Sequence, residues 1–350
     1  CPNGAVTVTG YTDNQGSDAV NLKLSDTRAK AVAAALLLGC GDVNSTADTT
    51  GTPVDPNSLP GGACTTASYH AEQGQKLQGS RSSSFTVQGV SLGCGYLQDL
   101  HVEGAELVAT GRSGPVRGTA LMGATVALAD DKGAPATARI TGIERDATDP
   151  NGATFLYTLM YKDPATGAEV SACLPDPSGA AKALPLRGRW DASGAHVEVG
   201  ASISLGCTSG VLAKCVRWGY RPWETVKGTA LADYHQACTR MARADYCGDG
   251  HSYTQDGTAI DIYDRLPVLS RDSSLLSLFE STWTPDGAYC VARERWLSLF
   301  GLLPPNCTLK FELAIESNPV DLNDLCLMKR SGIQASDALL SNSTGINIKL

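Results

Sequence analysis

The sequence has no long apolar segment and no cluster of basic residues. Its longest purely apolar run, residues 31–38, is far shorter than the roughly 20 residues that a bilayer-spanning helix needs. The formal net charge is −8, and a chain without a Lys/Arg cluster lacks the cations that displace counterions from a phosphate backbone. The sequence therefore predicts neither a transmembrane helix nor a nucleic-acid partner.

Two signatures of zinc sites are also missing. No two cysteines have the Cys-x-x-Cys spacing of a structural zinc site, and no His-Glu-x-x-His segment of a zinc hydrolase occurs. The sequence thus predicts no metal site and no cofactor, and it assigns no catalytic residue.

Cysteine, by contrast, is abundant. The chain has 12 cysteines, and such a number scattered through a glycine-rich sequence is typical of an oxidising compartment. Apart from Cys1 and Cys40, ten remain as candidates for structural disulfides, with their connectivity left open: Cys64, Cys94, Cys173, Cys207, Cys215, Cys238, Cys247, Cys290, Cys307 and Cys326.

The N-terminal region carries a specific motif. Residues 5–13 alternate as a strand does, and a helical pattern follows from Ser17. Across both segments, Thr-Asp is followed after ten residues by Leu-Ser, after two more residues by Arg-Ala, and after a further two residues by Val. This pattern resembles the start of the OmpA-type peptidoglycan-binding domain. The resemblance implies that Asp13 and Arg28 hold the diaminopimelate of the peptide stem, because a carboxylate pairs with an ammonium group and a guanidinium grips a carboxylate.

The same residues also fit a bacterial lipoprotein signal. A basic stretch precedes the apolar residues 31–38, and the Leu-Leu-Gly-Cys segment that ends at Cys40 matches a lipobox. Cys40 would then attach a lipid anchor to the outer membrane, and the polar residues 41–60 would form a flexible tether. The two interpretations exclude each other in one mature chain, and translation that begins near residue 22 or 24 would reconcile them.

Beyond a flexible linker at residues 41–84, residues 85–220 have a β pattern. Segments at residues 104–111, 118–143 and 153–170 alternate apolar with small or polar residues, and turn-forming clusters separate them. The predicted class is mainly β with an α+β C-terminal part, as a β-sandwich or partly open barrel followed by a disulfide-stapled helix and hairpins.

The remaining part, residues 221–350, is expected to contain that helix and those hairpins. Leu231, Tyr234, Cys238 and Met241 follow a helical stripe, and Gly248 is expected to end the helix. Residues 279–296 predict a hairpin that turns at Thr-Pro-Asp-Gly, residues 284–287.

Four segments of this part resemble the ADYC-domain family of bacterial secreted proteins: AKCVRWGYRPW, ACTRMARADYCGDG, DGTAIDIYD and WTPDGAYC. The family takes its name from the element Ala244-Asp245-Tyr246-Cys247, and the resemblance extends over roughly residues 100–300. It implies an exported, cysteine-rich and often lipid-anchored protein, without an activity that carries over.

The residues around this element leave several hypotheses. One hypothesis is that Cys247 is a thiolate nucleophile, but a disulfide is favoured. Its partner is not expected to be Cys238, because Cys238 lies about 13 Å away along a continuous helix, which is too far for a disulfide. The loop that follows is rich in carboxylates, which suits a calcium site. With His251, the same carboxylates suit an extracytoplasmic hydrolase. A role of these residues in turns and helix caps explains them without a metal. These carboxylates are Asp245, Asp249, Asp256, Asp261 and Asp264.

The sequence therefore favours an exported protein of the bacterial cell envelope, an outer-membrane lipoprotein or a periplasmic or extracellular protein. Its expected role is a non-enzymatic interaction or structural module of unknown ligand and protein partners. A hydrolase and a peptidoglycan-tethered envelope protein are the alternatives.

Overall fold

The computed structural model describes nine stretches of the chain: residues 85–93, 95–129, 135–163, 166–198, 200–255, 257–272, 277–297, 308–345 and 347–348. The chain divides into two compact units, Cys1–Gly61 and Gly62–Leu350, and every described residue belongs to the second. Predictions on the following positions lie outside the described residues: Asp13, Arg28, Cys40, Cys64, Cys94, Asp256, Cys307 and the linker at residues 41–84.

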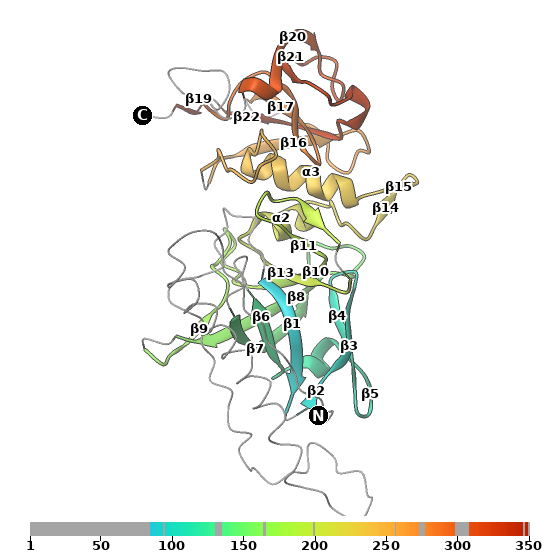
Figure 1. The fold of residues 1–350 in the computed structure, drawn as a ribbon, viewed down its shortest axis with the longest axis vertical. Helices are drawn as coiled ribbons and strands as arrows, with labels where there is room; N and C mark the ends of the chain where they lie inside the picture. The colour runs from blue at the N-terminus through green and yellow to red at the C-terminus, as the bar shows by residue number, and fades with distance from the viewer. Residues whose placement is uncertain are drawn as a thin grey trace, which may run out of the picture. The chain divides into compact units, whose positions relative to one another are not determined.

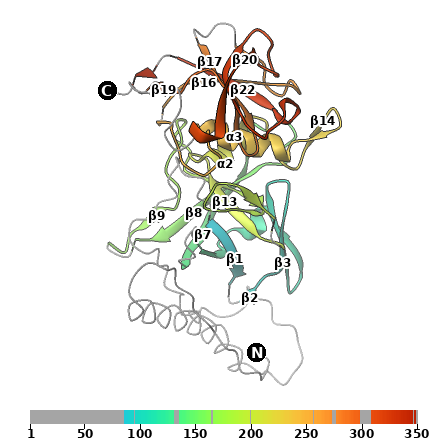
Figure 2. The ribbon, with the colours of Figure 1, turned by 45° about the horizontal axis from the view of Figure 1, so that its top comes forward.

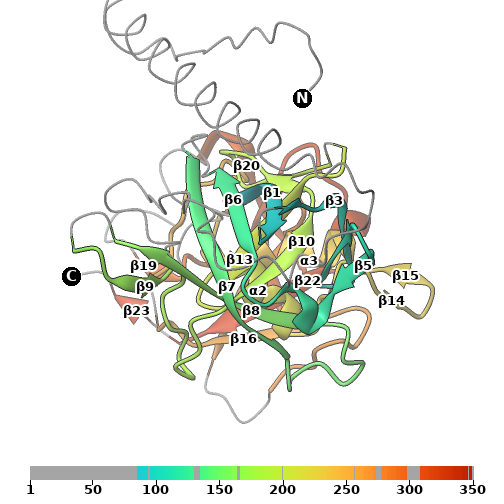
Figure 3. The same cartoon turned by 90° about the horizontal axis from the view of Figure 1, so that it is seen from below.

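Six antiparallel strands close into a barrel (Figure 1, Figure 3). Its strands, in the order in which they pair, are β10 (Ala183–Arg187), β13 (Ile203–Cys207), β1 (Phe85–Leu92), β6 (Thr125–Ala129), β7 (Pro135–Arg145) and β8 (Phe155–Lys162). Pairing of Ala183 on β10 with Tyr157 on β8 closes the ring. Two short strands, β2 (Gly95–Tyr96) and β9 (Glu169–Ser171), extend β1 and β8. The predicted mainly β class is confirmed, and of the two predicted architectures the barrel is the one observed, in closed form.

The barrel interior is filled by alternate residues of each strand. Val126 and Leu128 on β6, and Ile203 and Leu205 on β13, are buried in one core cluster, because successive side chains of a strand point to opposite faces. A three-stranded sheet adds Leu107 to this core. That sheet consists of β3 (Gln98–Glu103), β4 (Glu106–Gly111) and β5 (Gly114–Arg117), and the 3-10 helix η2 (Gly118–Leu121) follows it.

A short helix, α2 (Val211–Arg217), covers part of the barrel's outer face. Leu212 and Val216 of α2 pack against Leu184 and Leu186 of β10. Four consecutive residues of β10 are therefore buried. Leu184 and Leu186 face α2 on the outside of the barrel, and the alternate residues face the opposite side of the strand.

The second helix, α3 (Ala232–Arg243), is covered on most sides, and ten of its twelve residues are buried. A disulfide between Cys215 and Cys238 joins it to α2. On the barrel side, Trp190 Nε1 donates to Gln236 Oε1 at 3.0 Å. Short strands accompany the helices: β11 (Arg189–Trp190), β12 (His196–Val197), β14 (Thr225–Val226) and β15 (Thr229–Ala230). Within the described residues, no helix is long and apolar enough to cross a membrane.

An antiparallel sheet of six strands packs against α3 (Figure 2). In order, its strands are β16 (Ile260–Asp264), β22 (Leu340–Thr344), β17 (Leu278–Thr284), β18 (Gly287–Val291), β21 (Leu325–Arg330) and β20 (Phe311–Ser317). The remaining elements are β19 (Trp296–Leu297), β23 (Asn347–Ile348) and the 3-10 helices η3 (Thr308–Lys310) and η4 (Ala335–Asp337). Thr284 on β17 pairs with Gly287 on β18, which confirms the predicted hairpin.

Two neighbouring strands of this sheet, β17 and β22, carry polar side chains that are nevertheless buried. Ser281 and Thr282 on β17, and Ser341 and Ser343 on β22, have no exposed surface. Their hydroxyls form hydrogen bonds with residues distant in the sequence: Thr282 Oγ1 lies 2.8 Å from Ser341 Oγ and 2.7 Å from Asn318 Oδ1. Buried hydroxyls tolerate an apolar environment when they form such bonds.

Candidate functional site

The ADYC element begins where α3 ends. Ala244 caps the helix in the left-handed conformation, with φ 53° and ψ 41°, and is fully buried. The prediction that Gly248 ends the helix is wrong by four residues, because tertiary packing holds a non-glycine residue in this conformation. Gly248 has another role: a Cβ there would lie 1.7 Å from the carbonyl oxygen of Asp286, so the glycine permits close approach to the turn between β17 and β18.

Asp245 fixes the loop that follows. Its carboxylate pairs with Arg240 Nη1 at 2.6 Å and accepts the backbone N–H groups of Asp249 at 3.2 Å and Gly250 at 3.0 Å. Arg240 also donates to the carbonyls of Ser193 in the β11–β12 turn and Pro285 in the β17–β18 turn. The Asp245 side chain therefore acts as a turn former at a junction of three segments, as the structural interpretation expects.

Tyr246 completes a buried polar network. Its hydroxyl donates to Glu280 Oε1 at 3.0 Å and accepts the backbone N–H of Arg295 at 2.8 Å. Burial, with the nearby Glu280 carboxylate, raises the pKa of Tyr246 well above its usual value, so this phenol remains protonated as a donor.

Arg295 extends this network to the end of α3. Its guanidinium pairs with the Glu280 carboxylate at 3.0 Å, and both side chains are completely buried. It also donates to the carbonyls of Met241 at 2.7 Å and Ala242 at 3.1 Å. A cation at the C-terminus of a helix stabilises the unpaired carbonyls there, so Arg295 connects the sheet to the ADYC element.

The described cysteines are all disulfide-bonded. Three bonds join Cys173 to Cys207, Cys215 to Cys238 and Cys290 to Cys326. Cys247 is disulfide-bonded as well, and because Cys238 is paired with Cys215, the expectation that Cys247 has another partner is confirmed. A sulfur in a disulfide is not a thiolate, so the nucleophile hypothesis does not fit this structure.

The described carboxylates of the predicted acidic loop are dispersed and do not converge on one site. Asp264 accepts the N–H groups of Leu266 at 2.7 Å and Leu269 at 2.8 Å, as a turn former does. His251 is exposed and lies 4.7 Å from the Tyr253 ring. Across the described stretches, no group of three or more His, Cys, Asp or Glu side chains is arranged to hold a metal ion.

A segment of strand β1 resembles the serine nucleophile motif of a hydrolase family. Residues 89–93 read Gly-Val-Ser-Leu-Gly, which fits the Gly-x-Ser-x-Gly pattern of α/β-hydrolases. That motif requires a sharp turn between a strand and a helix, whereas Ser91 lies within β1, paired with Thr125 and Tyr96. The barrel strand does not present this serine as a nucleophile.

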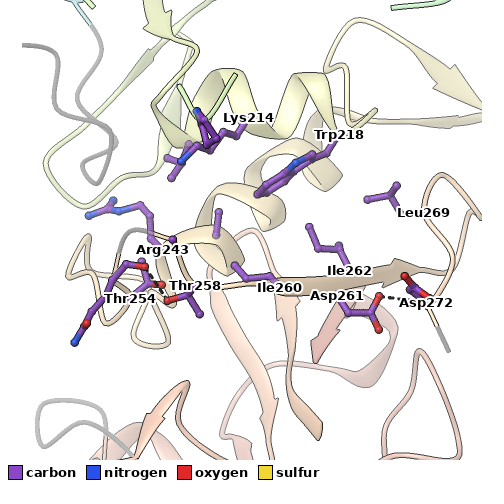
Figure 4. Close-up of a pocket in the computed structure, with 15 residues that line it drawn as sticks. Lys214, Trp218, Arg243, Thr254, Thr258, Ile260, Asp261, Ile262, Leu269 and Asp272 are labelled. Atoms are coloured by element: carbon purple, nitrogen blue, oxygen red, sulfur yellow. Dashed lines mark hydrogen bonds between the residues drawn. The ribbon is translucent and has the colours of Figure 1, made fainter. Parts of the chain in front are cut away.

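A pocket of about 520 Å³ lies between α2, the end of α3 and β16. Figure 4 shows the Trp218 ring facing Ile260 and Ile262, which project from β16 toward α2. Val211, Ala242 and Leu269 continue this apolar lining. His251 does not line the pocket, so the arrangement of His251 with two carboxylates that the hydrolase hypothesis requires is not found there.

Charged and polar side chains lie at the two ends of the pocket. Lys214 and Arg243, with the hydroxyls of Thr254 and Thr258, lie at one end, and Asp261 and Asp272 lie at the other (Figure 4). The sequence did not predict this pocket, because its walls come from segments between Pro177 and Asp272, up to 95 residues apart, and no local motif marks them.

Comparison with protein families matches residues 118–297 to the ADYC domain, which is more than half of the chain. The chain therefore belongs to the ADYC domain family. Residues 2–47 match the OmpA family, and this segment includes Asp13 and Arg28. No curated protein and no solved structure shows significant similarity to the chain. The OmpA match and the disulfides are consistent with an extracytoplasmic or cell-envelope location.

Proposed function

We propose that this chain is an exported cell-envelope protein that associates with peptidoglycan through its OmpA-like segment and presents the ADYC region as a disulfide-stabilised interaction module. The OmpA-family match over residues 2–47 carries the peptidoglycan part of the proposal. The interactions of the ADYC side chains support the proposal of a stabilised module. Asp245 forms an ion pair, Tyr246 a hydrogen bond and Cys247 a disulfide, all within the protein.

The proposed recognition rests on two charged residues of the OmpA-like segment. The ammonium group of diaminopimelate pairs with the Asp13 carboxylate, and a carboxylate of the same residue binds the Arg28 guanidinium through two parallel hydrogen bonds. Such recognition requires both groups of the stem residue, so a sacculus without a free diaminopimelate end should bind less protein.

Sedimentation with purified peptidoglycan tests this proposal on the full chain. Asp13→Ala combined with Arg28→Ala should reduce the bound fraction at least about tenfold, because two charge-assisted contacts are lost. Asp18→Ala combined with Lys23→Ala removes the same charges from the same segment, outside the two motif positions, and should bind as the unmodified chain does. Equal binding by both double variants would refute the assignment of Asp13 and Arg28.

A lipid anchor at Cys40 is the alternative proposal for the attachment to the envelope, since signal cleavage before Cys40 would remove Asp13 and Arg28 from the mature chain. It rests on the Leu-Leu-Gly-Cys segment at residues 37–40 and on the polar tether composition after it. Metabolic labelling with palmitate should mark the protein, and Cys40→Ala should abolish the label while Cys64→Ala retains it. Labelling that persists in Cys40→Ala would exclude this anchor, and recovery of Asp13 in the mature N-terminal peptide would exclude signal cleavage at Cys40.

A further inference from the structure

We propose that β20 binds an extended peptide segment of a partner protein, which adds a strand to the six-stranded sheet. The apolar side chains of this segment lie against Leu313 and Ile315, and its basic side chains lie opposite Glu312 and Glu316. This inference specifies the partner of the interaction module and rests on that part of the proposed function. It does not depend on peptidoglycan association.

The backbone of β20 suits such pairing because β20 is an outermost strand of the sheet. Among the described residues, β21 pairs with one side of β20 and no strand pairs with the other side (Figure 1). Alternate N–H and C=O groups of an outermost strand point away from its sheet, so they form a template for another extended chain. Main-chain hydrogen bonds of this kind supply affinity, and the side chains supply specificity.

The β20–β21 hairpin also concentrates exposed apolar side chains. Of the eight large apolar side chains that are exposed in the described residues, five lie within residues 309–325. On β20, Leu313 is 77% exposed and Ile315 is 76% exposed. Singly scattered apolar residues are normal on a protein surface, whereas a concentration of them marks an interaction site. Apolar side chains of a partner strand would remove this surface from water.

Two carboxylates flank these apolar residues on the strand, since residues 312–316 read Glu-Leu-Ala-Ile-Glu. Lys329 Nζ lies 3.8 Å from Glu312 Oε1 and 3.5 Å from Glu316 Oε2, and in the described stretches no other cation is within ion-pair distance of either carboxylate. One ammonium group therefore faces two carboxylates, so the group of three is negative. Opposite charges on facing positions of two strands attract. A partner strand with the order basic, apolar, any residue, apolar, basic thus complements β20.

The same order of charges disfavours a second copy of this chain as the partner. Residues 312–316 carry the same order of charges in both directions. Antiparallel pairing that places Leu313 opposite Ile315 of another copy also places Glu312 opposite Glu316. Parallel pairing in register places each glutamate opposite itself. Like charges on facing positions destabilise a pair of strands, and a basic partner strand avoids this repulsion.

A β-bulge favours a short partner segment. The register of β20 against β21 shifts between Leu313 and Glu316. A bulge bends its strand and increases the local twist, so a long flat strand does not follow this edge. Probes of seven residues match the length of β20.

Fluorescence anisotropy with the full chain and three fluorescein-labelled peptides tests the proposal: TKVTVKT, TEVTVET and TKVPVKT. The first peptide should bind at least about fivefold more tightly than the second, because two facing charge pairs change from attractive to repulsive. The third peptide has the same charge as the first, but proline lacks an N–H donor and disfavours pairing within a sheet. Its affinity should also be at least about fivefold lower than that of the first.

Two substitutions locate the binding surface. Ile315→Lys removes an exposed apolar side chain and adds a cation, so it should weaken binding of TKVTVKT at least about fivefold. Leu322→Lys is the matched control, because Leu322 is also 76% exposed but lies between β20 and β21 rather than on a strand. It should leave the affinity unchanged.

Equal affinity for TKVTVKT and TKVPVKT, no binding at millimolar peptide, or equal effects of Ile315→Lys and Leu322→Lys would overturn the proposal. A dimer in analytical ultracentrifugation that Ile315→Lys dissociates would also overturn it, because β20 would then be an interface between copies of this chain. Peptidoglycan sedimentation of the Asp13 and Arg28 double variant concerns other residues, so failures of the two parts of the proposed function are distinguishable.

Discussion

The Tyr246 hydroxyl lies 3.0 Å from Glu280 Oε1 and donates to it, although the two residues are 34 positions apart. This bond ties the ADYC element to the central strand of the six-stranded sheet. It also gives a physical reason for a tyrosine at this position: the same oxygen accepts the Arg295 N–H, and only a hydroxyl both donates and accepts.

Tyr246→Phe should therefore lower the free energy of unfolding by about 2 kcal/mol, because it removes two buried hydrogen bonds, one to the Glu280 carboxylate and one from the Arg295 N–H. Urea unfolding monitored by circular dichroism measures the change. Tyr161→Phe, at the partly exposed end of β8, is the control and should shift the free energy by less than about 0.5 kcal/mol. Equal effects of the two substitutions would contradict the role of the Tyr246 hydroxyl.

Removal of the cation from the buried Arg295–Glu280 ion pair should lower the free energy of unfolding by more than Tyr246→Phe does. Arg295→Met should destabilise the protein by about 4 kcal/mol, since Glu280 would remain as an uncompensated buried charge. Arg187→Met removes one partner of an exposed pair, with Arg187 Nε and Glu198 Oε1 3.8 Å apart, and should cost less than about 1 kcal/mol. Chemical denaturation of both variants compares them directly, and an Arg295 variant as stable as the Arg187 variant would refute the proposed network.

Acidification should destabilise the protein through His235. This side chain is buried and donates to the Leu212 carbonyl, and burial lowers its pKa from 6.5 to about 4. The unfolded chain binds a proton below pH 6.5 whereas the folded protein does not until about pH 4, so stability is complete above pH 6.5 and falls as the pH decreases toward 4. The slope should approach about 1.4 kcal/mol per pH unit.

Denaturation series between pH 7.5 and pH 4.5 test this expectation. His235→Gln retains an N–H donor without a titrating group, so its slope should be flatter in this window. His101→Gln removes an exposed histidine whose pKa is raised by the Asp99 carbonyl. Below about pH 6 this group is protonated in both the folded and the unfolded state, so the substitution should leave the slope there unchanged. A slope in His235→Gln as steep as in the unmodified chain would show that other groups cause the pH dependence.

The Cys215–Cys238 bond should contribute substantially to stability. It closes a segment with a sequence separation of 23, for which loss of chain entropy in the unfolded state predicts about 3 kcal/mol. Cys215→Ala combined with Cys238→Ala should lower the urea midpoint accordingly. The unmodified protein in the presence of reductant should fall at least as far, because all its disulfides are then opened; no shift in the double variant would refute the contribution.

Much of the local structure could be predicted from the sequence. Alternation within residues 118–143 and 153–170 predicted strands where β6, β7 and β8 are observed, because a strand with one buried face must repeat every second residue. The hairpin at Thr284 and Gly287 followed from a turn sequence whose preference is intrinsic to its residues. The ADYC element was recognised from contiguous letters, as local motifs are.

Tertiary structure alone decided the features that depend on distant partners. Closure of the barrel rests on Ala183 meeting Tyr157, and disulfide connectivity rests on which cysteines folding brings together. Ala244 ends α3 because packing outweighs the preference for glycine. The polar sequence of β22 is buried because long-range hydrogen bonds satisfy it. The pocket beside Trp218 likewise exists only once α2 and β16 face each other, since no residue of one segment carries information about the position of the other.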